Sequence, residues 1–283
     1  MIGREFRFFA PTELQQALQL LAELGEDARP LAGGMTLVPL MTLGLAQPEA
    51  IVSLNHLKGM DGVRDGGDCL RIGAMTRHAT VERDPLVRLH CPPLAQAAAC
   101  VGDRQVRHRG TLGGSLAHAD PAADYPPVML ACGARMRLRG VAGERVVAAG
   151  DYFTGLFCTE LQPGELLSEI EVPKIPPDHA HSYLRLQRVE GSFPIVNVAA
   201  LLTPDLSVAR LALGGVGSTA VMVDVAPDLA GGMKREALER AGEKAYAAAQ
   251  AATDDMNGSA QYRRAMARLY AQRAIEQALA RRS

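Results

Sequence analysis

The chain has 283 residues, 48% of them hydrophobic, which is typical of a globular protein long enough for two domains. Its 30 Lys and Arg residues nearly balance its 31 Asp and Glu residues, so the formal net charge is −1. This balance excludes the basic surplus that binds nucleic acid or an anionic membrane. No stretch is long and apolar enough for a membrane span, and residues 1–10 lack the apolar centre of a signal peptide, so we expect a cytoplasmic protein.

The cysteines give no sign of a metal centre. They are widely spaced, and no pair has the C-x-x-C spacing of a zinc or iron–sulfur site. The five residues are Cys69, Cys91, Cys100, Cys132 and Cys158. We therefore expect no metal ligand on this chain.

The N-terminal segment has the pattern of a βαβ unit. Between Pro11 and Gly25, apolar residues recur every three or four positions, which predicts an amphipathic helix. Strands are predicted at residues 29–32 and 51–54. Between these strands, a Gly-Gly turn leads into a short helix.

This first Gly-Gly turn lies in Leu31-Ala32-Gly33-Gly34-Met35-Thr36-Leu37. Adjacent glycines let the backbone adopt a positive φ and let a ligand approach the amides closely. A strand, a turn and a helix N-terminus bring oriented N–H groups and the positive end of the helix dipole to one point, which suits a pyrophosphate. The spacing differs from the G-x-G-x-x-G of a Rossmann fold, which argues against a nicotinamide dinucleotide here.

A second Gly-Gly stretch occupies residues 111–126 and contains almost no bulky side chain. Thr111 and Ser115 place a hydroxyl on either side of its two glycines. This composition predicts a loop whose free N–H groups cradle phosphate oxygens without a positive side chain.

Three arginines precede these glycines, and two histidines lie near them. Arg104, Arg107 and Arg109 are either a solvated face or electrostatic support for a phosphate or a partner subunit. We assign no catalytic role to His108 or His118, because a lone histidine is more often a satisfied polar residue than a base.

Hydrophobic patterning predicts further elements around the second stretch. Helices are predicted at residues 76–83, 93–101 and 125–132. Strands are predicted at residues 70–74, 135–139, 145–148 and 166–172. Three prolines within residues 173–177 indicate a linker and a domain boundary.

The last third has its own pattern of strands followed by helices. Strands are predicted at residues 181–189, 196–202 and 208–213, and Ala-rich helices at 238–252 and 260–281. This order predicts a small α+β domain in which helices cover a three-stranded sheet.

The two Gly-Gly stretches together resemble those of the flavin-binding medium subunit of the molybdenum hydroxylases, the group that contains xanthine dehydrogenase and aerobic carbon monoxide dehydrogenase. In that family a Leu-Ala-Gly-Gly loop precedes an apolar helix, and a later Thr-Ile/Leu-Gly-Gly-Asn/Ser loop runs into Ala-Asp-Pro-Ala-Ala-Asp. Both motifs are present here in the same order. The resemblance extends from Phe6 to the Ser-Ala-Gln-Tyr-Arg-Arg element at residues 259–264, and so covers nearly the whole chain.

The resemblance implies an α+β protein with two domains. Residues 1–175 would form an FAD-binding domain of the vanillyl-alcohol-oxidase-like (PCMH) type, with subdomains at about 1–57 and 58–175. Residues 176–283 would form the C-terminal domain of the molybdenum hydroxylase flavoproteins.

The resemblance also implies which residues hold FAD. Both glycine loops would wrap the pyrophosphate and the ribityl chain, Asp124 would hydrogen-bond the cofactor, and Leu167 would lie against the flavin ring. Arg185 stands where many members have Lys, and it keeps the charge but not the compact ammonium. The implied cofactor-binding residues are Ala32, Gly33, Gly34, Met35, Thr36, Leu37, Thr111, Leu112, Gly113, Gly114, Ser115, Asp124, Leu167 and Arg185.

The implied function is electron transfer without a catalytic side chain on this subunit. Electrons would come from molybdenum on a large subunit through iron–sulfur clusters on a small subunit, and this FAD subunit would pass them to NAD, oxygen, a quinone or a carrier protein. A dimer of large-medium-small heterotrimers is the expected assembly. Two alternatives remain open at this point: a free-standing flavin-dependent oxidase and a non-enzymatic nucleotide-binding module.

Overall fold

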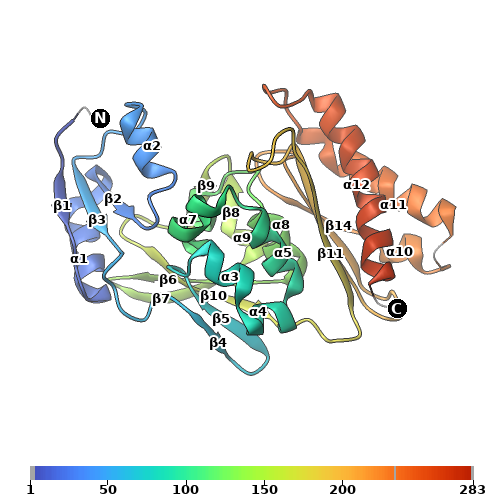
Figure 1. Cartoon of the computed structure of the whole chain (residues 1–283), viewed down its shortest axis with the longest axis horizontal. Helices are drawn as coiled ribbons and strands as arrows, with labels where there is room; N and C mark the ends of the chain where they lie inside the picture. The colour runs from blue at the N-terminus through green and yellow to red at the C-terminus, as the bar shows by residue number, and fades with distance from the viewer. Residues whose placement is uncertain (1–3, 233, 282–283) are drawn as a thin grey trace.

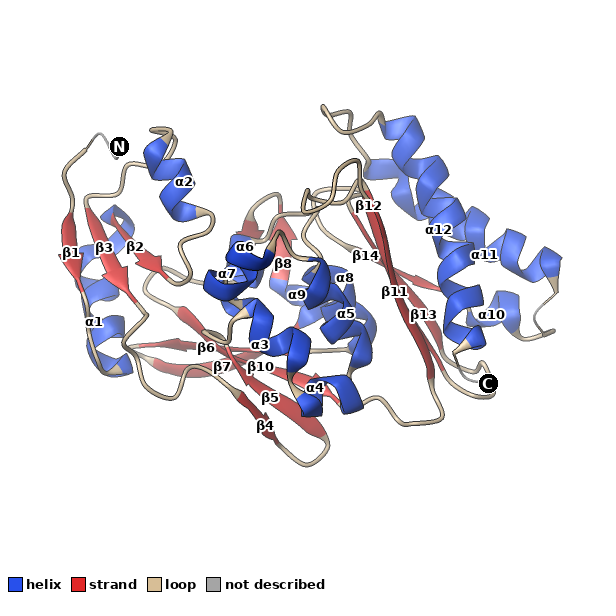
Figure 2. Ribbon diagram, viewed as in Figure 1, coloured by secondary structure: helices blue, strands red, loops and turns tan. Residues whose placement is uncertain are grey.

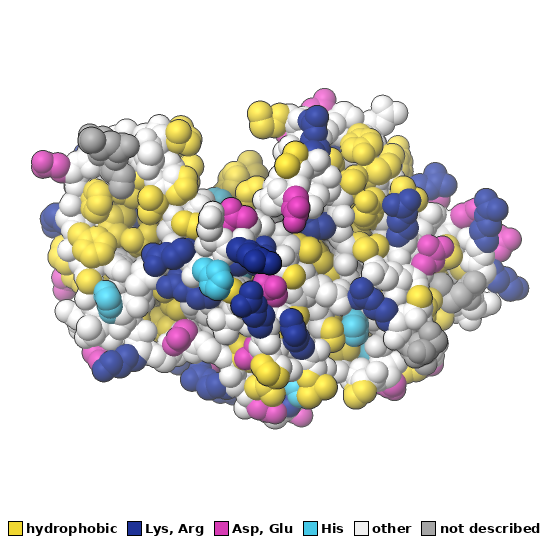
Figure 3. Space-filling model, in the orientation of Figure 1, with side chains coloured by type: hydrophobic (Ala, Val, Ile, Leu, Met, Phe, Trp, Pro, Cys, Tyr) yellow, Lys and Arg dark blue, Asp and Glu magenta, His cyan; other side chains and the backbone are white. Residues whose placement is uncertain are grey.

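The computed structural model describes residues 4–232 and 234–281, so the outer ends of the predicted domains at residues 1 and 283 lie outside the described residues. An N-terminal unit, a central unit and a C-terminal unit follow one another along the long axis (Figure 1). The space-filling view shows a hollow at the upper edge between the N-terminal unit and the rest of the molecule (Figure 3).

The N-terminal unit is the predicted βαβ arrangement. Its three parallel strands have the order β1-β3-β2, and they are β1 (Arg7–Phe9), β2 (Ala28–Leu31) and β3 (Ala50–Ser53). Helix α1 (Leu14–Leu24) buries Ala17, Leu18 and Leu21, which is the apolar face that the spacing predicts. The 3₁₀ turn η1 (Gly25–Asp27) follows α1, and the short helix α2 (Leu37–Thr42) follows the first glycine loop.

The central unit is built on a five-stranded antiparallel sheet (Figure 2). In spatial order the strands are β4 (Val63–Asp65), β5 (Cys69–Gly73), β10 (Leu166–Pro173), β6 (Arg135–Gly140) and β7 (Gly143–Ala148). Strand β10 is buried over nearly all of its length because β5 and β6 flank it. Strands β8 (Phe153–Gly155) and β9 (Cys158–Thr159) form a separate two-stranded hairpin.

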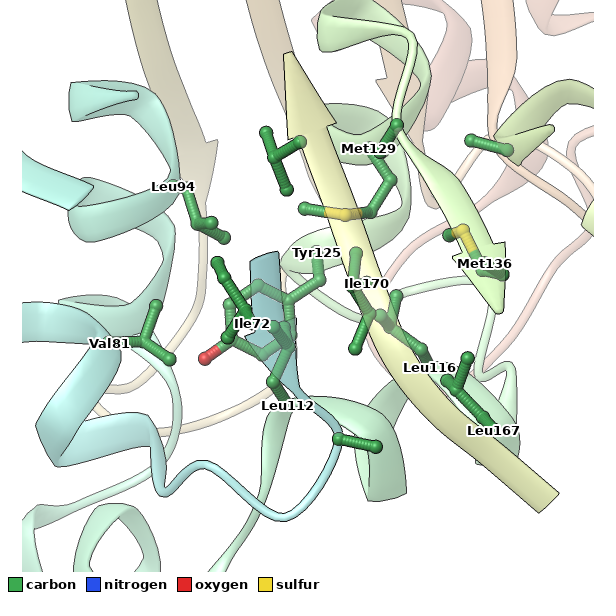
Figure 4. Packing of buried hydrophobic residues seen from close by; sticks show 14 of the residues in the cluster. Ile72, Val81, Leu94, Leu112, Leu116, Tyr125, Met129, Met136, Leu167 and Ile170 are labelled. Atoms are coloured by element: carbon green, nitrogen blue, oxygen red, sulfur yellow. The ribbon is translucent and has the colours of Figure 1, made fainter. Parts of the chain in front are cut away.

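Short helices cover the central sheet. They are α3 (His78–Arg83), α4 (Pro85–His90), α5 (Pro92–Cys100), α6 (Arg104–Arg109), α7 (Leu112–His118), α8 (Tyr125–Cys132) and α9 (Ala149–Tyr152). Figure 4 shows side chains from the sheet, Ile72 and Ile170, meeting Leu112, Tyr125 and Met129 from the helices. This core fixes α7 and α8 against the sheet, and with them the segment between the two helices.

The C-terminal unit is a four-stranded antiparallel sheet with helices on one face. Its strands are β11 (Ala180–Leu186), β12 (Val196–Leu202), β13 (Ala209–Gly214) and β14 (Val221–Asp224). Its helices are α10 (Ala226–Leu229), α11 (Arg235–Ala248), the 3₁₀ turn η2 (Ala249–Ala251) and α12 (Ala260–Ala280). Helix α8 of the central unit packs against β12 and β13, so this sheet lies between helices of two units.

The predicted α+β class is therefore confirmed, but the prediction of three strands in the C-terminal sheet is wrong by one. The missed strand, β14, has only four residues and lies at the edge of the sheet, where hydrophobic alternation is weakest. Within residues 4–232 and 234–281, no helix is long and apolar enough to cross a membrane.

Candidate functional site

The two glycine loops touch each other at the junction of the N-terminal and central units. A Cβ atom on Gly33 would lie 2.2 Å from the carbonyl oxygen of Arg109 and 2.7 Å from Cα of Gly110. A Cβ on Gly114 would lie 3.5 Å from Cβ of Ala32. Both loops are predicted from the sequence to belong to one site, and the structure brings them together.

Two side chains that were not predicted from the sequence clamp this junction. Asn55 donates from Nδ2 to the carbonyl oxygen of Ala32 over 3.0 Å and accepts at Oδ1 from Arg77 Nη2 over 3.0 Å. Arg77 also donates to the carbonyl oxygen of Arg109. Both side chains line a cavity of about 190 Å³ between the two units. The only local signal was that Asn55 is a polar residue shortly after a buried strand.

The first glycine loop carries the free backbone donors. Within the described part of the chain, the N–H groups of residues 32–37 have no hydrogen-bond acceptor. Gly34 has a φ of 77°, which confirms the expected left-handed turn at this residue. Consecutive unpaired N–H groups around a left-handed residue form a concave anion site, so this loop fits a diphosphate group.

The second glycine stretch does not have the free N–H groups that the sequence analysis predicted. Thr111 caps helix α7 and accepts from the Gly114 N–H at Oγ1 over 3.1 Å. The N–H groups of Leu112 and Gly113 donate to the carbonyl oxygens of Thr76 (2.9 Å) and Ala74 (2.8 Å). This prediction is wrong because the stretch is a helix that docks by its first turn, not a loop open to a ligand.

The glycines of this stretch serve close packing. Neither Gly113 nor Gly114 has a positive φ, and a Cβ on Gly113 would lie 2.4 Å from Cβ of Ala74. Gly114 and Ser115 are half-buried, and no described residue bonds the Ser115 hydroxyl. What α7 presents toward a ligand is therefore a small, flat surface with one hydroxyl.

Asp124 lies just before α8 and is only 5% exposed. Its Oδ1 accepts hydrogen bonds from Tyr183 Oη over 2.5 Å and from Arg185 Nη1 over 2.9 Å, both from β11. No described residue donates to its Oδ2. The carboxylate thus keeps one acceptor atom for a cofactor, as the assignment of Asp124 requires.

Leu167 and Arg185 fit their assignments less directly. Leu167 is 5% exposed and lies near Leu116 in the core, so it offers a flavin ring little surface (Figure 4). Arg185 is engaged by its own chain, since its guanidinium contacts Asp124 and two backbone carbonyls. Both assignments stay predictions.

His78 forms hydrogen bonds to residues just before and within the second glycine stretch. Its Nδ1 shares a 2.8 Å hydrogen bond with Tyr125 Oη, and its backbone N–H donates to the carbonyl oxygen of Gly110 over 3.1 Å. Burial, followed by the charges of Arg107 and Arg77, lowers the pKa of His78 to about 4. The imidazole is therefore neutral in the folded protein at physiological pH.

This lowered pKa predicts a dependence of stability on pH. Because the unfolded state binds the proton at a higher pKa than the folded state, the stabilisation is complete above about pH 6.5 and is lost as the pH falls toward 4. We expect His78→Gln to flatten this part of the profile of unfolding free energy against pH. Urea unfolding of both proteins between pH 7 and pH 4.5 measures it, and parallel profiles would contradict the assignment.

Two family models match the chain. Residues 4–175 match "FAD binding domain in molybdopterin dehydrogenase", and residues 181–278 match "CO dehydrogenase flavoprotein C-terminal domain". Fold and site thus define a two-domain FAD-binding flavoprotein. The chain belongs to the flavoprotein family of the molybdopterin dehydrogenases.

Full-length relatives and solved structures agree with this family. The chain is 38% identical to the carbon monoxide dehydrogenase medium chain of Afipia carboxidovorans, with 99% of each chain covered. It is 34% identical to the nicotine 6-hydroxylase medium subunit of Paenarthrobacter nicotinovorans, with 97% and 98% covered. The structure is similar to the reconstituted CO dehydrogenase from Oligotropha carboxidovorans, with a TM-score of 0.94, 36% identity and 99% and 100% coverage.

A quinoline 2-oxidoreductase structure from Pseudomonas putida 86 is also similar, with a TM-score of 0.91, 33% identity and 100% and 99% coverage. The predicted family, the FAD cofactor and the role as the FAD subunit of an oxidoreductase of the molybdenum hydroxylase type are confirmed. The relatives are named as medium chains or subunits, which makes them parts of larger assemblies.

Proposed function

We propose that the chain holds FAD at the junction of its N-terminal and central units, collects electrons from iron–sulfur clusters of a partner subunit and passes them to an external acceptor. The observation that carries this proposal is the row of unpaired N–H groups at residues 32–37, set against the small surface of α7 in the domain that matches the FAD-binding family. Bound FAD can take electrons singly and deliver them in pairs.

The chain's own residues have separate tasks in this proposal. The first glycine loop binds the diphosphate through backbone N–H groups, and Thr36 adds a hydroxyl at the start of α2. Helix α7 gives the cofactor room and offers the Ser115 hydroxyl. Asp124 accepts a hydrogen bond at Oδ2. The same proposal retains the residues of both loops, Leu167 and Arg185 as the cofactor-binding set.

The electron donor has to come from another chain in this proposal. Among residues 4–232 and 234–281, no group of three His, Cys, Asp or Glu side chains could hold a metal. Exposed apolar side chains occur in the N-terminal unit and in the central unit, and a partner would bury them. They are Val38, Leu43 and Leu45 near α2, and Leu156 and Phe157 at the tip of the β8–β9 hairpin. We propose a large molybdenum subunit and a small iron–sulfur subunit as partners. The proposed assembly is a dimer of large-medium-small heterotrimers.

Co-expression with the large and small subunits encoded nearby tests this function. We expect a stable complex in size-exclusion chromatography whose visible flavin absorbance bleaches when an electron-donating substrate is added without oxygen. Carbon monoxide and nicotine, which the names of two relatives contain, are the first substrates to add. A monomer that binds neither subunit and oxidises a substrate by itself would instead support a free-standing oxidase.

A further inference from the structure

A buried polar network joins Asp124 to the C-terminal unit. Tyr183 Oη donates to Asp124 Oδ1, and Asn197 Nδ2 donates to Tyr183 Oη over 3.1 Å. Asn197 Nδ2 also donates to the carbonyl oxygen of Ala123 over 3.0 Å, one residue before the carboxylate. The acidic residue thus belongs to the first family-matched domain, while its partners come from strands of the second.

Arg185 completes the network from the same face of β11. Its side chain is 7% exposed and that of Asp124 is 6% exposed, so the ion pair is sealed from solvent. Besides Asp124, the guanidinium donates to the carbonyl oxygens of Cys100 (2.6 Å) and Ser192. Three acceptors in different directions suit the fork of an arginine better than a lysine ammonium.

We propose that Tyr183, Arg185 and Asn197 are positioning residues for the cofactor: they hold Oδ1 of Asp124 so that Oδ2 alone is presented to FAD. This inference rests on the proposed function, because it gives Asp124 a contact with the cofactor. It also changes the role of Arg185, which becomes the counter-ion of Asp124 and acts on FAD through it.

The electrostatics around Asp124 make the inference measurable. Burial raises the pKa of Asp124, whereas the Arg185 charge and the hydrogen bonds from Tyr183 and Arg185 lower it. The other titratable groups that face the carboxylate are Tyr125 on α8 and Cys100 on α5. Both are neutral at physiological pH because burial raises the pKa of each. Burial outweighs the other causes, so the pKa of Asp124 is raised, and Arg185 and Tyr183 favour the ionised, accepting form against that burial.

Tyr183→Phe removes only the hydroxyl group, which donates to Asp124 and accepts from Asn197, and Asn197 keeps its bond to the carbonyl oxygen of Ala123. We expect it to weaken FAD binding by about tenfold at pH 8, as for a lost hydrogen bond to a charged group. The loss should be larger at pH 6, because the pKa of Asp124 rises further and its protonated form is a poorer acceptor. The measurement is titration of the cofactor-depleted complex with FAD at both pH values, followed by flavin fluorescence.

Two further variants identify the cause. Tyr152→Phe removes the hydroxyl of another fully buried tyrosine that does not contact Asp124, and it should leave both affinities unchanged. In an Asp124→Asn background, Tyr183→Phe should no longer produce any pH-dependent loss, because the titrating group is gone. Arg185→Lys should weaken binding but keep a pH profile close to that of the wild type, since the positive charge remains.

The outcomes separate the inference from the function on which it rests. A wild-type complex that takes up no FAD overturns the proposed function. A wild type that binds FAD, with Tyr183→Phe matching it at both pH values, overturns the positioning role alone. A loss that is equal at pH 8 and pH 6 assigns the tyrosine a packing role and overturns the positioning role, and so does a pH-dependent loss that persists in the Asp124→Asn background.

Discussion

Replacing Gly33 with alanine is expected to give a protein that purifies without FAD. The new Cβ would meet the backbone of Arg109 and Gly110, at 2.2 Å and 2.7 Å. That backbone has little freedom to move, because His78 N–H and Arg77 hold its carbonyl oxygens and Gly110 N–H bonds to Val106. The two glycine loops must therefore separate, at an overpacking cost of about 1–3 kcal/mol, and the diphosphate site opens.

The FAD content of purified Gly33→Ala, measured by absorbance against protein concentration, checks this prediction. Gly150→Ala is the matched control, since Gly150 has no positive φ and no atom within 4 Å of the added Cβ. We expect full FAD occupancy in the control. Full occupancy in Gly33→Ala as well would show that the contact between the loops is not needed for cofactor binding.

Replacing Arg185 with methionine is expected to cause the largest loss of stability. The change leaves the Asp124 carboxylate buried without a cation. Removing one partner of a buried ion pair typically costs about 3–5 kcal/mol. For a chain of this size, the midpoint of thermal unfolding should fall by on the order of 10 °C.

The sign of the pH dependence identifies the cause of that loss. Burial already raises the pKa of Asp124, and without Arg185 the pKa rises further. A carboxyl whose folded pKa exceeds its unfolded value is destabilising when ionised, so the deficit is greatest at high pH and shrinks as the pH falls through the folded pKa. Thermal unfolding of wild type and Arg185→Met at pH 8 and pH 5 measures this, with the exposed Arg210→Met as control. A deficit that does not change with pH would point to lost packing instead.

Much of the fold follows from local patterns. Helix α1 buries the residues that its spacing predicts, α8 lies where a continuous apolar run indicated it, and β10 lies where strand patterning was predicted. Helix α7 was missed because its Gly-Gly pair and short length oppose helix formation in an isolated peptide. Its first turn is held instead by Thr76 and Ala74, which tertiary structure brings to it.

The site was predictable only where the chemistry is local. The first glycine loop has its donors in six consecutive residues, so its sequence alone indicated an anion site. The clamp of Asn55 and Arg77 comes from distant segments, as do Tyr183 and Asn197 beside Asp124, and the sequence singled out none of these four. Of the partners of Asp124, only Arg185 was predicted, through the family resemblance. A residue such as Tyr183 gains its role from strand register, which places it opposite Ala199 and beside the carboxylate.

The partners of Asp124 also have a consequence for the order in which the protein is made. A nascent chain that has reached residue 175 contains both glycine loops, but it has no partner for the buried carboxylate. Tyr183 and Arg185 leave the ribosome later, and the sheet that holds them is finished only with β14 at residue 224. On the proposed assignment of Asp124, the complete cofactor site is thus a product of late translation, and its last structural support is made after the whole FAD-binding family match.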